Sequence, residues 1–430
     1  MNNQVIALMR IMLNPKITST ALRVLRELRK KGKPRLPEVV LNDLEHKTPG
    51  KESVSLIRKW LHSELISRHN KQWVLNSFLP PFPGTSFNRM FENLLSGRRL
   101  SPVSAYLAVT ASCPNNCWHC SHKNRKSGDV SQGDWMTIIK DLVDLGTSII
   151  GFTGGEPFSR KDLGALVQCA AAQQATTIVF SSGAFVTRQK LERLKDAGLW
   201  GICISLDHPE QDQYDAMRGN TGAFNTALSA IEQSIAAGFY TMIGMTATVE
   251  LIEKKHYITL YDLARRLGVH EVRIIEPMPC GALEQSSADT FLSPEQIAEL
   301  RRFHIATNKK RRLPKVCAFN QIESPEVFGC GAGTQHLFID SAGQVCPCDF
   351  TPLSFGNATS ESLAAIWKKM NAAMGNPRRH CFIQKHHNLI SEYKGHGFPI
   401  APQISEKICR EAGKEPLPDF FQLVTGKVNL

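Results

Sequence analysis

The sequence predicts an α/β fold built around a partial (β/α)6 barrel, with a helical domain before it and a small cysteine-containing domain after it. Strand-like and helical runs alternate from about residue 103 to residue 275. Apolar residues make up 42% of the 430 residues, which is enough to bury a large core. Many of the twelve cysteines fall into two groups, one after the first strand-like run and one beyond the last.

The N-terminal region, residues 1–78, is predicted to be a basic helical domain, with residues 79–100 as a linker. Between Ile17 and Lys33, apolar residues recur at helical spacing and basic side chains occupy the other face. A second amphipathic run extends from Ser53 to Ile66. The segment 79–84 contains three prolines, which would end any helix.

The basic charge of the chain belongs to this region. Residues 1–100 contain 18 Lys and Arg against 7 Asp and Glu, a net charge of +11, whereas the remainder contains 33 against 32. A region with this much positive charge attracts an anionic partner, which would be a phospholipid surface, a nucleic acid or an acidic peptide. The alternative is that the basic side chains form a solvated helix face and bind no partner. Neither a membrane span nor a secretory signal is apparent, so we expect a cytoplasmic protein, with peripheral membrane contact as an option.

Residues 101–312 are predicted to form the barrel. The strand-like runs are Ala105–Thr110, Ser148–Phe152, Thr177–Ser181, Gly201–Leu206, Tyr240–Thr248 and Glu271–Ile275. The helical runs between them are about Gln132–Leu145, Lys161–Gln173, Gln189–Ala197, Ala223–Ala237 and Tyr257–Leu267. Six successive β/α units favour a parallel sheet with right-handed crossovers. Functional residues gather at the C-terminal ends of the strands in such sheets.

The segment after the first strand contains a Cys-x3-Cys-x2-Cys array, formed by Cys113, Cys117 and Cys120. Iron–sulfur clusters take thiolate ligands, and three from one short loop leave the fourth iron of a [4Fe-4S] cube open to a small molecule. A structural zinc site completed by His122 is the alternative, although zinc loops favour two-residue spacings. The array therefore predicts a cluster with an open iron.

A second motif, Gly154-Gly155-Glu156-Pro157, ends the next strand-like run. In this order the two motifs resemble the radical S-adenosylmethionine (SAM) superfamily, over about residues 101–370. The resemblance implies that the three cysteines hold a [4Fe-4S] cluster and that the Gly-Gly-Glu-Pro turn meets the amino group of SAM. It also implies reductive cleavage of SAM to a 5′-deoxyadenosyl radical, which abstracts hydrogen from an unactivated C–H bond. No side chain beyond the cluster and cofactor is predicted to be catalytic.

Other strand ends supply the remaining residues predicted to bind the cofactor. Ser182, Ser205 and Asp207 resemble the superfamily's ribose- and methionine-contacting turns, and Arg218 resembles an arginine that pairs with the carboxylate of SAM. Many members have Asn where Ser182 stands, which leaves the ribose contact open. Glu156 is expected to be partly structural, because a carboxylate at a strand end can accept hydrogen bonds from neighbouring backbone amides.

Residues 313–385 contain the second group of cysteines, and residues 386–430 are predicted to be a C-terminal tail. The spacing Cys330-x12-Gly343-x4-Cys348 predicts a β-hairpin that turns at Gly343. It resembles the opening of the SPASM and twitch domains, which carry auxiliary iron–sulfur clusters. The dense cysteine run of a full SPASM domain is missing, so one auxiliary [4Fe-4S] cluster is predicted, with zinc as the alternative. Its expected ligands are Cys317, Cys330, Cys348 and Cys381, with Cys346 as the substitute.

The predicted function is that of a radical SAM enzyme. The SPASM and twitch resemblance implies a peptide or protein substrate that is cross-linked, oxidised or epimerised, and an electron donor such as flavodoxin or ferredoxin. The basic N-terminal region favours the alternative of a membrane lipid, an isoprenoid or another small molecule, and its helical pattern argues against a strand edge for binding a peptide. A non-catalytic redox sensor or nucleic-acid-binding regulator is a remote alternative, since it would have no use for the turn at Gly154.

Overall fold

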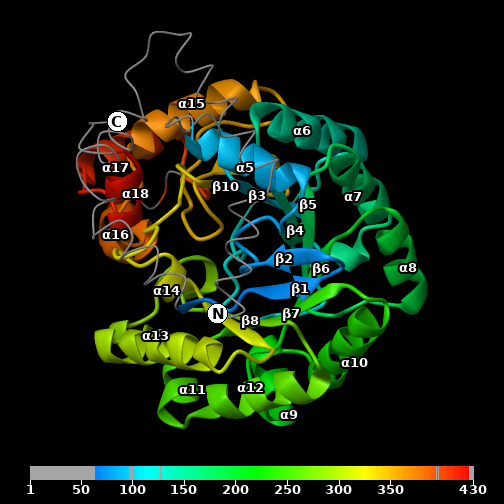
Figure 1. Ribbon diagram of the computed structural model, residues 1–430. Helices are drawn as coiled ribbons and strands as arrows, with labels where there is room; N and C mark the ends of the chain where they lie inside the picture. The colour runs from blue at the N-terminus through cyan, green and yellow to red at the C-terminus, as the bar shows by residue number, and fades with distance from the viewer. Residues whose placement is uncertain (1–62, 96–100, 126–127, 394, 396, 426–430) are drawn as a thin grey trace, which may run out of the picture.

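The computed structural model describes residues 63–95, 101–125, 128–393, 395 and 397–425. One curved sheet runs through the molecule, and helices follow its outer side (Figure 1). In the part of the chain described, no helix combines the length and the apolar character that a membrane span requires. The predicted helices within residues 1–62 lie outside the described residues.

The main sheet has nine strands in the order β11-β10-β3-β4-β5-β6-β7-β8-β9. Its strands are β3 (Ser104–Thr110), β4 (Ile149–Gly154), β5 (Thr176–Ser181), β6 (Gly201–Ser205), β7 (Tyr240–Thr246), β8 (Glu271–Ile275), β9 (Lys315–Ala318), β10 (His336–Ile339) and β11 (Val345–Cys346). Strands β3 to β9 and β10 are parallel to their neighbours, and β11 runs antiparallel to β10. The six predicted strands are β3 to β8, which confirms the partial (β/α)6 barrel.

Helices fill the connections between the strands, as the sequence predicts. Those around the barrel are α6 (Gln132–Leu145), α7 (Leu163–Ala172), α8 (Arg188–Asp196), α9 (Gln211–Arg218), α10 (Ala223–Ala236), α11 (Val249–Glu253), α12 (His256–Leu267) and α13 (Pro294–Lys309), with short 3-10 turns η1 (Pro157–Ser159), η2 (Gly281–Leu283) and η3 (Ala288–Thr290). Local sequence sets their ends. In α6 the Ser131 hydroxyl accepts the backbone N–H of Asp134 at the N-cap, and Gly146 (φ 119°) closes the C-terminus in a left-handed conformation.

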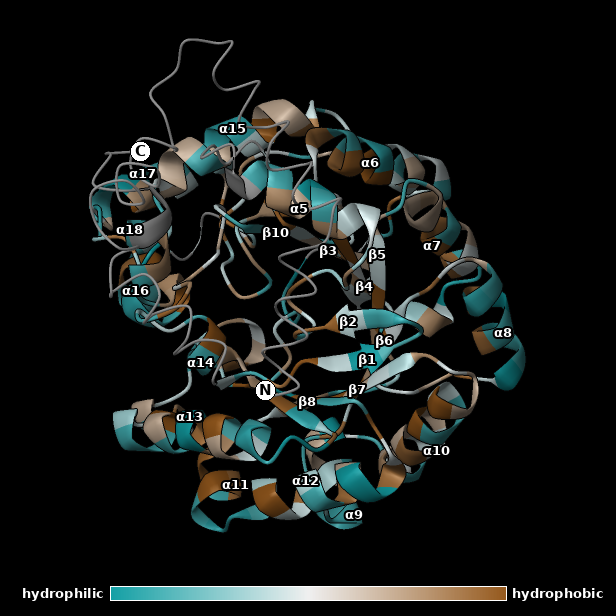
Figure 2. Cartoon of the chain, in the orientation of Figure 1, coloured by the Kyte–Doolittle hydropathy of each residue, from teal (hydrophilic) through white to brown (hydrophobic). Residues whose placement is uncertain are grey.

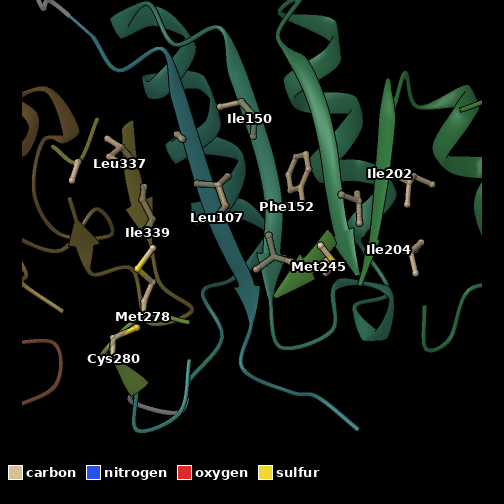
Figure 3. Packing of buried hydrophobic residues seen from close by; sticks show 14 of the residues in the cluster. Leu107, Ile150, Phe152, Ile202, Ile204, Met245, Met278, Cys280, Leu337 and Ile339 are labelled. Carbon is tan, nitrogen blue, oxygen red and sulfur yellow. The ribbon is translucent and has the colours of Figure 1, made fainter. Parts of the chain in front are cut away.

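The core lies between the sheet and these helices. Leu107, Ile150, Phe152, Ile202 and Ile204 come from strands β3, β4 and β6 and are fully buried in one hydrophobic cluster (Figure 3). The helices carry hydrophobic and hydrophilic residues on different faces (Figure 2). Burial of one large aliphatic side chain contributes about 1.5–3 kcal/mol. This packing fixes the positions of the strand ends that carry the site.

The segment before β3 differs from the prediction. Residues 67–74 form a hairpin of β1 (Ser67–His69) and β2 (Gln72–Val74), and the predicted linker contains helix α5 (Thr85–Leu95). The Lys315 ammonium group donates to the backbone carbonyl oxygens of Val74 (2.7 Å) and Leu75 (3.0 Å), deep among buried residues. The predictions of helix for residues 67–74 and of linker for residues 85–95 are therefore wrong.

The physical reason lies in side-chain burial. Phe82, among the prolines of the predicted linker, is buried and packs edge-on against Phe87 of α5, with ring centroids 5.1 Å apart. Val74 is fully buried against Ile149 and Tyr240 of the sheet. A strand of three residues is too short for its period to be read from the sequence.

The C-terminal region is joined to the barrel. Two of its strands extend the sheet: β9 pairs with β8, and β10 pairs with β3. The predicted hairpin is present as β10 and β11, with Gly343 at φ 84° in the turn. Helices follow in the order α14 (Phe319–Ile322), α15 (Leu363–Met374), α16 (Phe382–Glu392), α17 (Pro402–Glu411) and α18 (Asp419–Thr425). The last of these lie where the sequence predicts a tail.

Candidate radical SAM and auxiliary cluster sites

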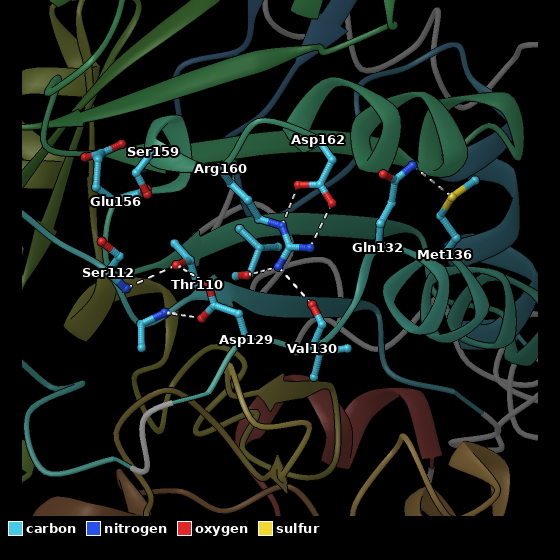
Figure 4. A network of polar contacts seen from close by, with 12 residues as sticks. Thr110, Ser112, Asp129, Val130, Gln132, Met136, Glu156, Ser159, Arg160 and Asp162 are labelled. Atoms are coloured by element: carbon cyan, nitrogen blue, oxygen red, sulfur yellow. Dashed lines mark hydrogen bonds and ion pairs between the residues drawn. The ribbon is translucent and has the colours of Figure 1, made fainter.

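A polar network fixes the end of β3, where the first cysteine loop begins (Figure 4). The Asp129 carboxylate accepts the Thr110 hydroxyl (2.6 Å) and the backbone N–H of Ala111 (2.8 Å). Arg160 forms a two-point ion pair with Asp162 and donates to the carbonyl oxygen of Val130 (3.0 Å). Sequence reasoning missed Asp129 and Arg160, because an isolated charged residue in a loop has no distinctive spacing.

The loop backbone lies directly against the Gly-Gly-Glu-Pro turn. The N–H of Gly155 donates to the carbonyl oxygen of Thr110 (2.7 Å), and the N–H of Glu156 donates to that of Ser112 (2.7 Å). A Cβ atom added at Gly154 or Gly155 would overlap these carbonyl groups, and Gly154 also has φ 126°. Both glycines are therefore required for the loop and the turn to approach this closely.

Glu156 holds the turn against the end of β5. Its buried carboxylate accepts the hydroxyl of Ser181 (2.8 Å), the hydroxyl and backbone N–H of Ser182 (2.6 and 2.8 Å) and the backbone N–H of Phe158 (3.1 Å). Burial raises the pKa of Glu156, and these donors oppose the shift. The Ser182 hydroxyl, predicted to contact the ribose, is thus hydrogen-bonded to Glu156 here. Pro157 is buried at the start of η1.

Asp207 and Arg218 form a buried ion pair beside the cysteine loop. Asp207 also accepts the backbone N–H of Thr246 (2.8 Å), and Arg218 donates to the sulfur of Cys117 (3.4 Å). His119 lies 3.9 Å from Asp207, and burial lowers its pKa to about 4. The end of β6, the end of α9 and the loop thus meet at one place.

The first cysteine loop lies beside the residues predicted to bind SAM, but not every one of these residues contacts another. Cys113 is exposed, whereas Cys117 and Cys120 are half-buried. The backbone carbonyl oxygen of Ser205 accepts a hydrogen bond from the Tyr214 hydroxyl (2.7 Å). No group of three or more His, Cys, Asp or Glu side chains among the described residues is already arranged to hold a metal ion.

The residues nevertheless fit an iron–sulfur cluster and SAM. Three thiols from one loop, with no carboxylate between them, are a soft donor set. Burial raises the pKa of Cys117, and the Arg218 guanidinium opposes this shift and so favours the thiolate that a metal requires. That Cys113, Cys117 and Cys120 are the ligands of this cluster stays a prediction from the sequence.

The second group of cysteines is divided by the structure. The thiols of Cys330, Cys348 and Cys381 shift one another's pKa values, and the effect is largest between Cys330 and Cys381. Cys317 lies instead on β9, opposite Arg273 of β8, and is fully buried. Three of the four predicted ligands thus influence one another, although no three such side chains in the described part of the chain are arranged to hold a metal ion, and Cys317 is separate from them.

Cys346, the predicted substitute, is also separate, because it contacts Arg125. One guanidinium nitrogen of Arg125 lies 3.6 Å from the Cys346 sulfur and 3.6 Å from the Asp340 carboxylate, and the other donates to the carbonyl oxygen of Asp349 (3.2 Å). The guanidinium also lies over the Phe338 ring, 4.8 Å from its centroid. Arg125 thus connects the segment after the first cysteine loop to the C-terminal hairpin. The sequence did not indicate this role, because Arg125 lies among other basic residues in a loop.

Two family models match the chain. The model described as the radical SAM superfamily matches residues 107–253. The SPASM model, described as an iron–sulfur cluster-binding domain, matches residues 330–391. The second match begins at Cys330 and includes Cys348 and Cys381, but it excludes Cys317.

Curated relatives and solved structures are similar to the chain over most of its length. The AdoMet-dependent heme synthase of Oleidesulfovibrio alaskensis is 26% identical over 353 residues, which covers 74% of this chain and 90% of that protein. The PqqA peptide cyclase of Methylocella silvestris is 26% identical over 294 residues, 62% of this chain and 74% of the cyclase.

The folds of solved proteins also match. Streptococcus suis SuiB bound to S-adenosylmethionine aligns with a TM-score of 0.54 at 17% identity, covering 69% of this chain and 76% of that chain. The SuiB complex with its precursor peptide SuiA aligns with a TM-score of 0.52 at 15% identity, covering 73% and 75%. These TM-scores show a similar fold, and at such low sequence identity they show the fold alone.

Proposed function

Because the chain is a radical SAM enzyme with a SPASM iron–sulfur domain, and its cofactors are SAM and [4Fe-4S] clusters, we propose that it modifies a peptide or protein substrate at an unactivated C–H bond. When bound, the cluster and SAM supply a 5′-deoxyadenosyl radical that abstracts hydrogen from the substrate. The outcome is a cross-link, an oxidation or an epimerisation, assisted by an auxiliary cluster.

The residues of this chain then have distinct roles. Cys113, Cys117 and Cys120 would hold the radical-generating cluster. Carbonyl groups of the turn at Gly154 would accept hydrogen bonds from the ammonium group of SAM, and Arg218 would orient its carboxylate. Asp207 keeps Arg218 charged and in place, since the two form a buried ion pair.

The observation that carries the proposal is the contact between the two cysteine regions. Arg125, shortly after Cys120, donates to the backbone of Asp349, the residue after Cys348. A substrate held at the C-terminal ends of the strands would therefore lie near both the radical source and the auxiliary cluster. PqqA peptide cyclase among the relatives, and SuiB with its bound precursor peptide among the folds, support a peptide as that substrate.

The way in which a peptide binds is limited by the sheet. At the β9 edge, the Asn308 side chain forms hydrogen bonds with the N–H and the carbonyl oxygen of Val316 (2.8 and 2.9 Å). The His304 ring accepts a hydrogen bond from the N–H of Ala318 (3.1 Å). At the β11 edge, Val345 pairs with the segment around Gly356. Neither edge of this sheet is open in the described part of the chain, so we expect the peptide to bind by side-chain contacts rather than as an added strand.

A second candidate substrate is a tetrapyrrole precursor of heme. The similarity to the heme synthase of Oleidesulfovibrio alaskensis extends over 90% of that protein, a larger share than the 74% of the peptide cyclase. A membrane lipid or isoprenoid is the remaining small-molecule option, and it rests on the charge of residues 1–100.

The test is substrate-dependent formation of 5′-deoxyadenosine. The reconstituted full chain, SAM and dithionite are incubated anaerobically with peptide, tetrapyrrole and lipid fractions from cells grown with deuterium. The proposal predicts deuterium in 5′-deoxyadenosine with the peptide fraction. Transfer from the tetrapyrrole or lipid fraction, and none from peptides, would refute the peptide assignment.

We also propose two partners. Reductive cleavage needs an electron, and a flavodoxin or ferredoxin would supply it in place of dithionite. The basic residues 1–62 would contact an anionic membrane, where each basic side chain contributes about 1 kcal/mol. A chain lacking residues 1–62 should then lose salt-sensitive binding to anionic vesicles, and equal binding would contradict the proposal. The deletion ends at residue 62 because the following hairpin packs into the barrel.

A further inference from the structure

Arg378 is a buried arginine in the SPASM part of the chain, and two of its donor atoms are unpaired. The residue is only 4% exposed. Its Nε and Nη1 atoms are buried and have no hydrogen-bond partner. Every nitrogen of a guanidinium group donates hydrogen bonds, and a buried charged donor without an acceptor is strongly destabilising. An anionic group within reach of these atoms would remove that cost.

The backbone places Arg378 directly opposite Cys330. The two residues form an antiparallel bridge, in which the N–H of Cys330 donates to the carbonyl oxygen of Arg378 (2.7 Å) and the N–H of Arg378 donates to that of Cys330 (3.4 Å). Opposite residues of an antiparallel pair direct their side chains to the same face, with Cβ atoms about 5 Å apart. The side chains of Arg378 and Cys330 therefore leave the backbone side by side.

A second contact ties the guanidinium group to the neighbour of Cys381. The guanidinium carbon lies 4.9 Å from the centroid of the Phe382 ring, and Phe382 follows Cys381 directly. Such a cation–π contact holds the charged group in place, but the ring does not replace a hydrogen-bond acceptor for the N–H groups. Arg378 is thus bonded through its backbone to one predicted cluster ligand and packed through its side chain against the residue next to another.

The carboxylates that contact the next residue are used there and do not neutralise Arg378. The Asp419 carboxylate pairs with the side chain of Arg379 (2.9 Å). The Glu415 carboxylate accepts the backbone N–H of Arg379 (3.0 Å) and pairs with Lys385. These acids therefore serve other groups.

Two other titratable groups near Arg378 do not neutralise it either. His386 packs against the same Phe382 ring, with ring centroids 4.9 Å apart, and carries no negative charge. Burial raises the pKa of the Cys409 thiol to about 12, so this thiol stays neutral at physiological pH. The acceptors that the bridge to Cys330 and the contact with Phe382 favour are the sulfur atoms of an iron–sulfur cluster.

We propose that Arg378 donates hydrogen bonds from Nε and Nη1 to the sulfur atoms of the auxiliary cluster beside Cys330 and Cys381, and that these bonds raise the reduction potential of the cluster. Hydrogen bonds to the sulfurs and the local charge both set such potentials. One-electron reduction adds a negative charge, which the guanidinium group stabilises. This role rests on the SPASM domain, whose family model matches residues 330–391, and is independent of the substrate class.

The test uses the full chain with Cys113, Cys117 and Cys120 changed to Ala, so that only the auxiliary cluster remains after anaerobic reconstitution. A dithionite titration followed by EPR gives its midpoint potential. Arg378→Met should lower the equilibrium constant for reduction by about tenfold or more, which corresponds to about 59 mV for one electron. Arg378→Lys keeps the charge with fewer donors and should shift the potential less, in the same direction. Each variant should retain about four irons per chain.

A second readout detects the contact itself. In the chain labelled with ¹⁵N-arginine, pulsed EPR of the reduced cluster should show a ¹⁵N coupling, which both Arg378 variants should lack. Arg379→Lys is the matched control, because the Arg379 side chain bonds to Asp419 and to the carbonyl oxygen of Leu417 (3.0 Å). It should keep both the potential and the coupling.

Three results would overturn the proposal. One is an unchanged potential in Arg378→Met with about four irons bound, and another is a ¹⁵N coupling that persists in Arg378→Lys or is absent from the parent chain. If Arg378→Met does not retain a cluster, an unchanged potential in Arg378→Lys overturns the proposal equally. A parent chain without iron would refute the auxiliary cluster itself, and no outcome here bears on the peptide assignment, because no substrate is present.

Discussion

Replacing Gly155 with Ala should displace the first cysteine loop. The added Cβ atom would overlap the carbonyl oxygen of Ser112 and lie 2.6 Å from its carbonyl carbon and 2.8 Å from the carbonyl oxygen of Ala111. Ordinary contact begins near 3.4 Å, so the loop must move by more than about 0.8 Å, which is the deficit at the carbonyl carbon alone. The clash involves backbone atoms, which no change of side-chain rotamer can relieve.

The cost follows from the bonds that this movement weakens. The N–H groups of Gly155 and Glu156 each donate to the loop over 2.7 Å, and each bond contributes about 1 kcal/mol. With about 1–3 kcal/mol for overpacking, loss of both bonds should lower the unfolding free energy of the variant by about 3–5 kcal/mol. A displacement of this size at a reacting centre should also slow SAM cleavage by about 100-fold.

Denaturant unfolding and the rate of 5′-deoxyadenosine formation measure the two effects. Gly164→Ala is the matched control, because a Cβ atom there has nothing within 4 Å and lies in helix α7. It should be neutral, or stabilising by up to about 1 kcal/mol through helix propensity. Wild-type stability together with wild-type SAM cleavage in Gly155→Ala would refute the reasoning.

Three further predictions follow from the same structure. The chain with its three loop cysteines changed to Ala should retain about four of about eight irons and form no 5′-deoxyadenosine, and continued SAM cleavage would contradict the cluster assignment. Glu156→Gln should lose about 1–3 kcal/mol in denaturant unfolding, since an amide nitrogen would face N–H and O–H donors; unchanged stability would show that the carboxylate does not hold the turn. Burial lowers the pKa of His69 to about 4, so the unfolded chain binds a proton between pH 6.5 and 4 that the folded chain does not. Stability should fall through that window by on the order of 1 kcal/mol at pH 5, discounted for partial exposure, and His69→Phe should reduce the slope.

The sequence by itself determined the barrel and the first cluster site. Apolar residues recur with a period of two in strands and 3.6 in helices, and this pattern can be recognised within a short stretch of sequence. The six strands β3 to β8 could therefore be predicted in order. The loop cysteines and the turn at Gly154 are likewise contiguous motifs, and their position at strand ends follows from the parallel topology. Cys330 and Cys348 were identified by the spacing around Gly343.

Tertiary structure decided which distant residues meet. Cys317 and Cys330 both belong to the second group of cysteines, but pairing of β9 with β8 places Cys317 in the barrel sheet, opposite Arg273. The segment before Cys330 is a loop that folds back on itself, with the N–H of Gly329 donating to the carbonyl oxygen of Ser324 (3.0 Å), and no periodicity encodes such a loop. The hairpin of β1 and β2 is fixed by burial against the sheet rather than by its own short strands, because two or three residues hold too few contacts to determine their conformation alone.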